Sequence, residues 1–212
     1  MLLDLDTEKA FAAIPYAQGH GVSESRLGSA MIYYVLTCMA HARACVCLGS
    51  GGGFVPCMMR QAQRDLEIDG AETYLVDAVL PEAGYGGPDV PLGWIDDYSM
   101  VQREFSDITI LSCLSIEAAA GFFRKNRTVI DYLHIDANHS FDAAWKDFEA
   151  YLPLLHPRAF LTFHDSAIGS IQSVLAMLLQ RYPHFECLDL PDVGAGLAIL
   201  RSRPSKDALA NS

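Results

Sequence analysis

The chain has 212 residues, of which 51% are hydrophobic and 19% are charged. This balance excludes a disordered chain and is typical of one globular domain with a substantial core. Lys and Arg number 15 against 26 Asp and Glu, which gives a formal net charge of −11. That charge repels nucleic-acid phosphates and anionic lipids, so we expect neither nucleic acid nor a membrane as partner. A small-molecule substrate is the expected partner, with a divalent cation as a further candidate ligand.

The N-terminus and the cysteines indicate the compartment. Met1–Phe11 is acidic and has no basic stretch before an apolar run, unlike a signal peptide. The most hydrophobic window, Met31–Leu48, contains His41 and Arg43 and is a poor transmembrane candidate. The six cysteines form no Cys-x-x-Cys pair, so we expect reduced core residues rather than disulfides or metal ligands. The sequence predicts a soluble, cytoplasmic protein.

Short apolar runs alternate with helix-period stretches along the chain, which is typical of a parallel sheet covered by helices. The expected strands are Ala44–Leu48, Glu72–Val76, Ile108–Leu114, Val129–Ile135, Ala159–Phe163, Phe185–Leu188 and Leu197–Leu200. The expected helices are Ser25–Ala40, Phe54–Glu67, Trp94–Phe105, Ser115–Phe123, Phe141–Leu155 and Ile171–Tyr182, with Ser115 and Ser140 as N-caps. The turn-rich stretch Leu80–Gly93 is expected to be a loop within one domain.

The last two strands have no helix between them, so they should be antiparallel neighbours. We therefore predict an α/β, Rossmann-like, doubly wound sheet of seven strands, six parallel and the last antiparallel. Leu197–Leu200 should insert beside Ala159–Phe163, and Val129–Ile135 should be central and buried. The whole chain 1–212 is expected to be one domain, with an N-terminal helical segment (1–43) and a Rossmann-like core (44–200).

A glycine-rich loop follows the first strand. Gly49, Gly51 and Gly53 alternate between the strand and a helix, where free backbone N–H groups can bind a ligand. The alternative is that these glycines only allow a tight turn between the strand and the helix and bind no ligand. A dinucleotide-binding loop would place a small residue where Phe54 stands.

The alternate glycine spacing resembles the loop of class I S-adenosylmethionine-dependent methyltransferases. The runs Asp136-Ala137-Asn138-His139-Ser140-Phe141 and His164-Asp165 resemble the small-molecule O-methyltransferase-like group of that superfamily. The resemblance covers about Ala44–Leu200. It implies a cofactor site formed by Gly49, Ser50, Gly51, Gly53, Asp77, Ser115 and Asp136. Asp77, which follows the second strand, would accept hydrogen bonds from ribose hydroxyls.

Three positions depart from the superfamily pattern. Cys47 stands near an often acidic position that helps to seat the methionine amine. Leu114-Ser115 stands where many members have an acid that contacts adenine. Arg158-Ala159 replaces paired glycines before the fifth strand, a change expected to alter only the turn.

Asp136, His139, His164 and Asp165 all follow strands, and the fold should gather them at the carboxyl edge of the sheet. We predict that Asp136, His164 and Asp165 hold a divalent cation such as Mg²⁺, with a polar cluster without metal as the alternative. His139 is either a helix cap or a catalytic base, and His164 is a second candidate base. No comparable motif surrounds the histidines His20, His41, His156 and His184. His134 is interpreted as a core residue within its strand.

The resemblance implies transfer of the S-adenosylmethionine methyl group to a hydroxyl oxygen, with Asp136, His139 and His164 as catalytic residues. The alternatives are an NAD(P)-dependent oxidoreductase and a non-catalytic module that binds S-adenosylmethionine. Phe54 and the closing hairpin argue against the oxidoreductase. Cys47 and Leu114 depart from the superfamily pattern, so a module that only binds S-adenosylmethionine remains an alternative. A homo-oligomer is compatible with the sequence. The sequence does not identify the methyl acceptor.

Overall fold

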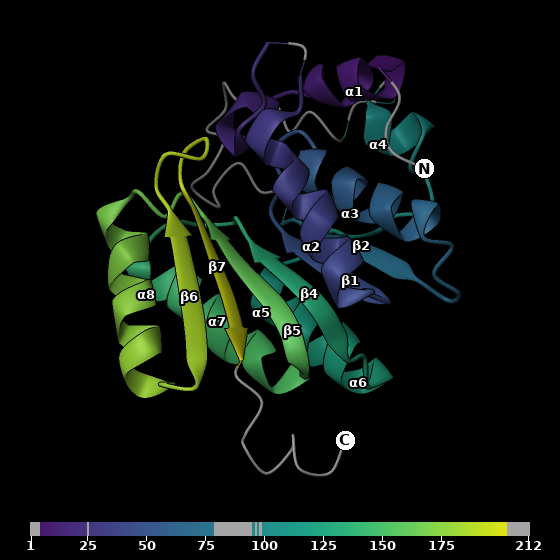
Figure 1. Ribbon diagram of the computed structural model, residues 1–212. Helices are drawn as coiled ribbons and strands as arrows, with labels where there is room; N and C mark the ends of the chain where they lie inside the picture. Colours follow the sequence, from purple (N-terminus) through teal and green to yellow (C-terminus); the bar gives the residue numbers. More distant parts are fainter. Residues whose placement is uncertain (1–4, 25, 79–94, 96, 98, 203–212) are drawn as a thin grey trace, which may run out of the picture.

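The computed structural model describes residues 5–24, 26–78, 95, 97 and 99–202 of the chain. Its strands are β1 (Ala44–Leu48), β2 (Glu72–Val76), β3 (Thr109–Leu111), β4 (Ile130–Ile135), β5 (Leu155–His164), β6 (Phe185–Leu190) and β7 (Leu197–Ser202). They form one seven-stranded sheet in the order β3-β2-β1-β4-β5-β7-β6 (Figure 1). Only β7 runs antiparallel to its neighbours, β5 and β6. The predicted fold class, the hairpin and the insertion of the last strand beside β5 are confirmed.

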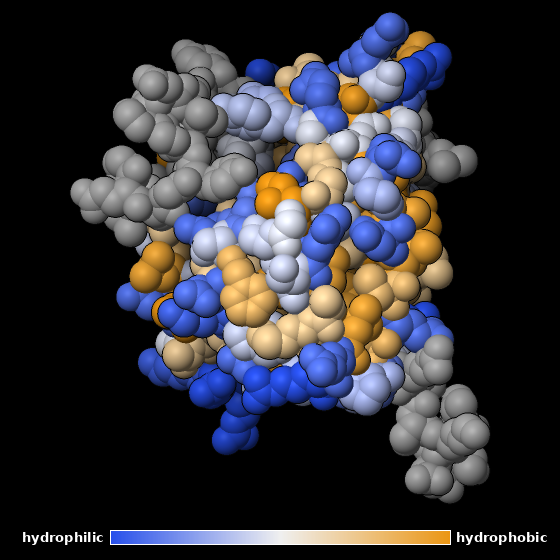
Figure 2. All heavy atoms as spheres, turned by 90° about the vertical axis from the view of Figure 1, so that its left-hand side faces the viewer, coloured by the Kyte–Doolittle hydropathy of each residue, from blue (hydrophilic) through white to orange (hydrophobic). Residues whose placement is uncertain are grey.

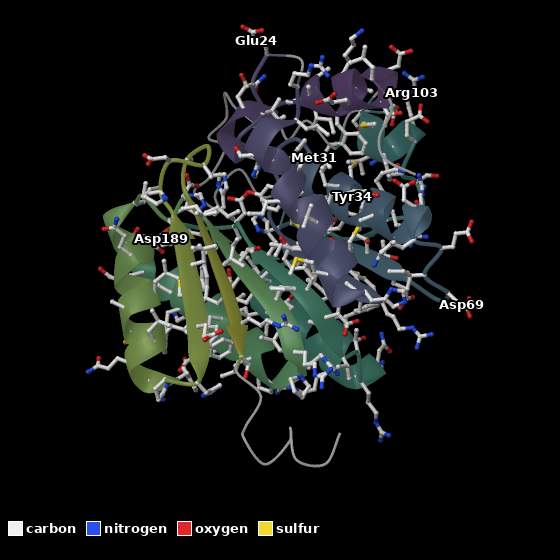
Figure 3. The ribbon with its side chains drawn as sticks, in the orientation of Figure 1. Glu24, Met31, Tyr34, Asp69, Arg103 and Asp189 are labelled. Carbon is white, nitrogen blue, oxygen red and sulfur yellow. The ribbon has the colours of Figure 1, made fainter. Side chains whose placement is uncertain are left out.

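Helices cover both faces of this sheet. The α-helices are α1 (Leu5–Ala12), α2 (Met31–Ala40), α3 (Phe54–Asp65), α4 (Met100–Arg103), α5 (Ser115–Ala118), α6 (Arg124–Asn126), α7 (Phe141–Tyr151) and α8 (Gly169–Arg181). Short 3₁₀ turns are η1 (Ala17–His20), η2 (Gly28–Ala30) and η4 (Leu152–Leu154), and η3 (Ala119–Phe123) is π-helical. One core contains side chains of α2 and α3, and the other contains side chains of α5, α7 and α8. Helix α2, which carries Met31 and Tyr34, crosses in front of the sheet (Figure 3).

β4 lies at the centre of the sheet because its side chains pack on both sides. Tyr132 belongs to the core under α2 and α3, whereas Leu133 and Ile135 belong to the core under α5, α7 and α8. All three are buried. The prediction for this strand is confirmed except at Val129, which is 55% exposed and precedes it.

Two expected helices are shorter than their patterns suggested. In place of Ser25–Ala40, the structure has the 3₁₀ turn η2 followed by α2, and the described part of Trp94–Phe105 contains only α4. Gly28 has a φ of +52°, whereas a right-handed α-helix requires a negative φ. The α-helix can therefore begin only after Gly28, which explains the late start of α2. The loop Leu80–Gly93 lies outside the described residues.

The last turn of the predicted helix Phe141–Leu155 is replaced by η4, and Leu155 already starts β5. Pro153 accounts for this end because proline supplies no backbone N–H to an α-helix. β5 thus includes Arg158 and Ala159, and its pairing with β4 shifts register between Ile130 and Tyr132. The departure at Arg158-Ala159 therefore falls within a strand rather than in a turn.

The expected helix Ser115–Phe123 is divided into α5 and the π-helical η3. Its N-cap is Leu114, whose backbone N–H donates to the Glu117 carboxylate at 3.2 Å, so the prediction of Ser115 as N-cap is wrong. The preceding strand β3 covers only Thr109–Leu111 of the predicted Ile108–Leu114. Ser140 does cap α7, since its hydroxyl accepts from the Ala143 N–H at 3.4 Å.

The N-terminal segment docks against the β6–β7 turn. The Ala195 N–H donates to the Gly19 carbonyl at 2.8 Å. A Cβ atom on Gly194 would lie 2.0 Å from the same carbonyl oxygen, so the two backbones touch. This contact places η1 at the carboxyl end of β5.

The six cysteines are free thiols. Cys45, Cys47 and Cys57 are buried, as the sequence predicted, whereas Cys38, Cys113 and Cys187 are only half-buried and are not core residues. The face that carries α8 and the edge strand β6 mixes hydrophobic and hydrophilic side chains (Figure 2). Leu188 on β6 is exposed there between Glu186 and Asp189, charges that oppose pairing with another strand. Among the described residues, no helix is both long and apolar enough to cross a membrane.

Candidate active site

The glycine-rich loop after β1 rests on the end of β4. Gly49, Gly51 and Gly53 have φ values of +70°, +52° and +85°. The Gly49 N–H donates to the Val76 carbonyl at 2.8 Å, and a Cβ atom on Gly49 would lie 2.5 Å from the Asp136 carbonyl oxygen. The loop therefore requires glycine at this position, and it directly adjoins the strand end that carries Asp136.

The N-terminal segment packs across the same loop. A Cβ atom on Gly51 would lie 3.1 Å from the Tyr16 ring, and one on Gly52 would lie 2.0 Å from the Pro15 carbonyl oxygen. A side chain added at Gly51 would thus meet Tyr16. Residues 15 and 16 cover part of the predicted cofactor loop.

Two further side chains of the loop region face inward. Ser50 is buried, and its hydroxyl has no hydrogen-bond partner among the described residues. The Cys47 thiol donates to the Gly49 carbonyl at 3.0 Å, and burial raises its pKa well above the usual range. Cys47 is therefore a neutral donor rather than the acid often found near this position. Ser50 leaves a buried hydroxyl available to a ligand.

Asp77 and Ser115, both predicted to contact the cofactor, differ in their surroundings. Asp77 follows β2 beside the loop, is half-buried and donates its backbone N–H to the Leu111 carbonyl at 3.1 Å. The Ser115 hydroxyl instead donates to the Asp147 carboxylate on α7. Burial raises the pKa of Asp147 to about 6, and this hydrogen bond opposes the shift.

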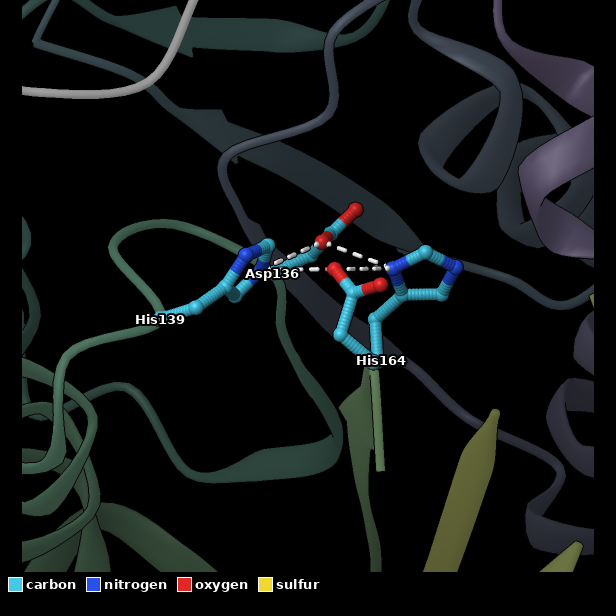
Figure 4. A group of neighbouring side chains, drawn as sticks. Asp136, His139 and His164 are labelled. Carbon is cyan, nitrogen blue, oxygen red and sulfur yellow. Dashed lines mark hydrogen bonds and ion pairs between the residues drawn. The ribbon is translucent and has the colours of Figure 1, made fainter. Parts of the chain in front are cut away.

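Asp136, His139 and His164 meet where β4 and β5 end (Figure 4). Asp165 belongs to the same group of side chains. Nε2 of His139 lies 3.2 Å from Oδ1 of Asp136 and 3.0 Å from Oδ2 of Asp165. Nδ1 of His164 lies 3.1 Å and 3.0 Å from the same two oxygens. The four donor atoms lie within 4.8 Å of one another and could hold a metal ion. We call these four residues the His-Asp cluster.

His164 is held as a cation in this arrangement. Its Nε2 lies 2.9 Å from the Gly19 carbonyl oxygen, which can only accept, so Nε2 carries a proton. Burial would lower the pKa of His164, but the carboxylates of Asp136 and Asp165 outweigh it and raise the pKa to about 11. Burial alone would raise the pKa of Asp136, yet His164 and its other histidine neighbours hold it well below the usual range. The cluster therefore places a protonated His164 imidazole beside an ionised Asp136 carboxylate.

His20 and His134 also lie at this site, although sequence analysis predicted no functional role for either. Nε2 of each lies 3.8 Å from Oδ2 of Asp136. Nδ1 of His20 lies 3.2 Å from the Tyr33 hydroxyl, and Nδ1 of His134 lies 2.8 Å from the Thr162 hydroxyl. Burial is the main cause that lowers the pKa of both imidazoles, so both are neutral at pH 7.

His134 had a signal in the sequence, because it is a polar residue in an apolar strand and stands two positions before Asp136. His20 had none, because its segment shows no motif. Its ring stacks on Phe54 and lies 4.3 Å from the His164 ring, between centroids. Only tertiary docking brings it to the His-Asp cluster.

A separate cavity of about 680 Å³ lies between α1, α3 and α4. Its lining includes Phe11, Ile14, Arg64, Met100 and Phe105. No residue of the His-Asp cluster lines it, so this cavity lies apart from the cluster.

Residues 46–166, more than half of the chain, match the family model described as "Methyltransferase domain". No curated protein matches the sequence. An O-methyltransferase from Bacillus cereus, solved with S-adenosylhomocysteine, is 15% identical, with a TM-score of 0.63 over 92% of this chain and 87% of that chain. TomG from Streptomyces achromogenes, an O-methyltransferase involved in tomaymycin synthesis and solved with S-adenosylmethionine, is 12% identical, with a TM-score of 0.65 over 96% and 93%. A Podospora anserina methyltransferase with S-adenosylhomocysteine bound is 14% identical, with a TM-score of 0.61 over 92% and 85%. Because the identities are this low, these matches show only that the chain has the same fold as the three structures.

Proposed function

The chain belongs to the methyltransferase-domain family, and we propose that it transfers the methyl group of S-adenosylmethionine to a hydroxyl oxygen of a small molecule. The observation that carries this proposal is the contact between the glycine loop and the His-Asp cluster, formed where Gly49 packs on the Asp136 backbone. A donor-binding loop thereby adjoins groups able to orient a hydroxyl and accept its proton. The net charge of −11 supports a small-molecule acceptor over a nucleic acid.

We assign donor binding to the loop and the strand ends beside it. Gly53 ends the loop at the N-terminus of α3, where the first backbone N–H groups lack a side-chain cap. The buried Ser50 hydroxyl offers a further polar group, and the Asp77 carboxylate is assigned to the ribose hydroxyls. Ser115 is the weakest member of the predicted set, because its hydroxyl already bonds to Asp147.

In the proposed reaction, the acceptor oxygen forms a bond to the methyl carbon as the carbon–sulfur bond breaks, and the hydroxyl proton passes to the protein. His139 is our candidate for the proton acceptor, because His164 is already protonated. The protein holds donor and acceptor in line, which can supply about 7–11 kcal/mol of the barrier. A divalent cation held by Asp136, His164 and Asp165 would displace the proton from Nδ1 of His164, and it would lower the pKa of the acceptor hydroxyl.

Titration calorimetry with S-adenosylmethionine, S-adenosylhomocysteine and NAD(H) tests the donor. We expect binding of the first two and no binding of NAD(H). A chain that binds only NAD(H) would be an oxidoreductase. One that binds the donor, yet methylates no compound in a panel of hydroxylated acceptors, would be the binding module.

Asp136→Asn tests the role of the cluster. We expect kcat to fall by at least about 100-fold, because groups that position or transfer protons contribute in that range. The Kd for S-adenosylmethionine should change by less than about threefold, a cost below 1 kcal/mol. The exposed Asp69→Asn is the control. Equal losses in kcat and donor affinity would place Asp136 in donor binding instead.

A further inference from the structure

The His-Asp cluster is unusually rich in nitrogen donors. His139 and His164 supply two of its four nearest donor atoms, and His20 and His134 present two more imidazoles to the far oxygen of Asp136. Imidazole nitrogen suits borderline first-row cations such as Zn²⁺ and Co²⁺. Mg²⁺ instead prefers oxygen ligands and keeps several waters.

The spacing of the donors fits a small four-coordinate ion. The four nitrogen-to-oxygen distances of the cluster fall between 3.0 and 3.2 Å. A tetrahedral site with metal–ligand bonds of about 2.0 Å has six edges of about 3.3 Å between its donor atoms, and these distances are close to four of them. An ion could therefore replace the protons within the cluster with little movement of the side chains.

Outer contacts already fix the ring of His164 for this role. Its Nε2–H donates to the Gly19 carbonyl at 2.9 Å, which leaves Nδ1 directed at the two carboxylates. Histidine ligands of metals are commonly oriented in this way, with the second nitrogen bonded to a carbonyl or carboxylate. The Ser170 hydroxyl donates to the His139 backbone carbonyl at 2.6 Å and holds that loop in place.

A second observation points independently to a ligand. His134 is fully buried, and its Nε2 has no hydrogen-bond partner among the described residues. That nitrogen is directed at Asp136, 3.8 Å from Oδ2. A buried polar atom of this kind is costly unless the site gains a further group that it can contact.

We propose that the His-Asp cluster binds one borderline divalent cation of the Zn²⁺ and Co²⁺ class in preference to Mg²⁺. Its ligands are Asp136, His139, His164 and Asp165. Cation binding itself does not depend on the proposed function, and only the role of the ion in methyl transfer rests on it. In this proposal His139 is a metal ligand instead of the catalytic base. His20 and His134 lie behind Asp136, each with Nε2 3.8 Å from Oδ2 of that carboxylate.

The test is direct cation binding by the full-length protein. Equilibrium dialysis should give one Zn²⁺ or Co²⁺ per chain, with affinity at least about 100-fold above that for Mg²⁺, as expected for nitrogen-containing sites. Bound Co²⁺ should show the visible absorption of a four-coordinate ion. Neither readout requires methyl transfer, and donor calorimetry on the same sample tests the proposed function separately.

Two variants examine the ligand set. His139→Gln should weaken Zn²⁺ binding by more than about 100-fold, beyond the range seen for loss of an outer partner. His164→Asp should shift the preference toward Mg²⁺, because it replaces a nitrogen donor with oxygen. His41→Asn is the matched control, since His41 is exposed and adopts a left-handed backbone that Asn tolerates. Circular dichroism of each variant checks that it is folded.

Three results would overturn the proposal: Mg²⁺ binding as tight as Zn²⁺ binding, no Co²⁺ absorption in the folded wild-type protein, or undiminished Zn²⁺ affinity in folded His139→Gln. If that variant keeps the ion but loses turnover, His139 is a base. Donor binding with no cation binding would leave the proposed methyl transfer standing and remove this inference alone.

Discussion

Asp147 is a carboxylate that the fold buries without a cationic partner among the described contacts. It is 4% exposed on α7 and accepts the Ser115 hydroxyl. Burial raises its pKa from 3.8 to about 6. The native state therefore binds a proton more tightly than the unfolded chain, and this contribution to stability is complete below pH 4. It is lost as the pH rises through about 6.

Asp147→Asn should remove this pH dependence. A shift of roughly two pKa units corresponds to about 3 kcal/mol, so the stability of the variant relative to wild type should rise by up to that amount between pH 4 and pH 8. Any cost of the buried amide is independent of pH and cancels in this comparison. Urea denaturation at the two pH values measures the difference, with the exposed Asp69 as the site of a control substitution (Figure 3). A stability difference that stays constant with pH would contradict this assignment.

The sequence predicted the residues that strand topology brings together. Asp136 and His164 end adjacent parallel strands, so their proximity follows from the fold. His20 could not be found in this way, because its position depends on a contact between backbones 175 residues apart in sequence, Gly19 and Gly194. Such contacts leave no periodic pattern in the sequence.

The element η1 depends on the β6–β7 turn. Gly194 has a φ of +59°, and its missing Cβ makes room for the Gly19 carbonyl, which also accepts from Nε2 of His164. This turn therefore connects the N-terminal segment to the His-Asp cluster.

Gly194→Ala should displace η1. Gly70 provides the matched control, because its φ is +64° and a Cβ atom there would meet nothing within 4 Å. Both substitutions carry a backbone cost of about 1–2 kcal/mol for left-handed alanine. Only Gly194→Ala should add a steric cost and increase hydrogen exchange in residues 14–21, which mass spectrometry can measure. Equal exchange in both variants would mean that the turn does not hold this segment.

The sequence predicted the long elements best. The apolar stripe of α7 and its Ser140 cap gave the start of the helix correctly, whereas its end was placed too late. The π-helical stretch η3 was not predictable, because it interrupts an otherwise helical pattern without proline. Packing of Phe123 against Tyr74 and Tyr151 accompanies this change of pitch.

One sheet separates the two cores of the described residues. In β1, Cys45 and Cys47 face the core under α2 and α3, and Val46 and Leu48 face the other. This arrangement follows from the alternation of side chains along a strand, and the sequence predicted it once a buried parallel sheet was inferred. Because β1 and β4 contribute to both cores, neither core can unfold while the other keeps its strands in place.

The two cores should therefore unfold in one transition. Met58 on α3 and Phe148 on α7 are fully buried on opposite sides of the sheet. Met58→Ala should cost about 2–5 kcal/mol and Phe148→Ala about 3–5 kcal/mol, because each leaves a cavity. In each variant, hydrogen exchange of α3 and α7 peptides should lose protection at the same urea concentration, lower than in wild type. If Phe148→Ala released α7 while α3 stayed protected, the two faces would be separate folding units, and the shared strands would not couple them.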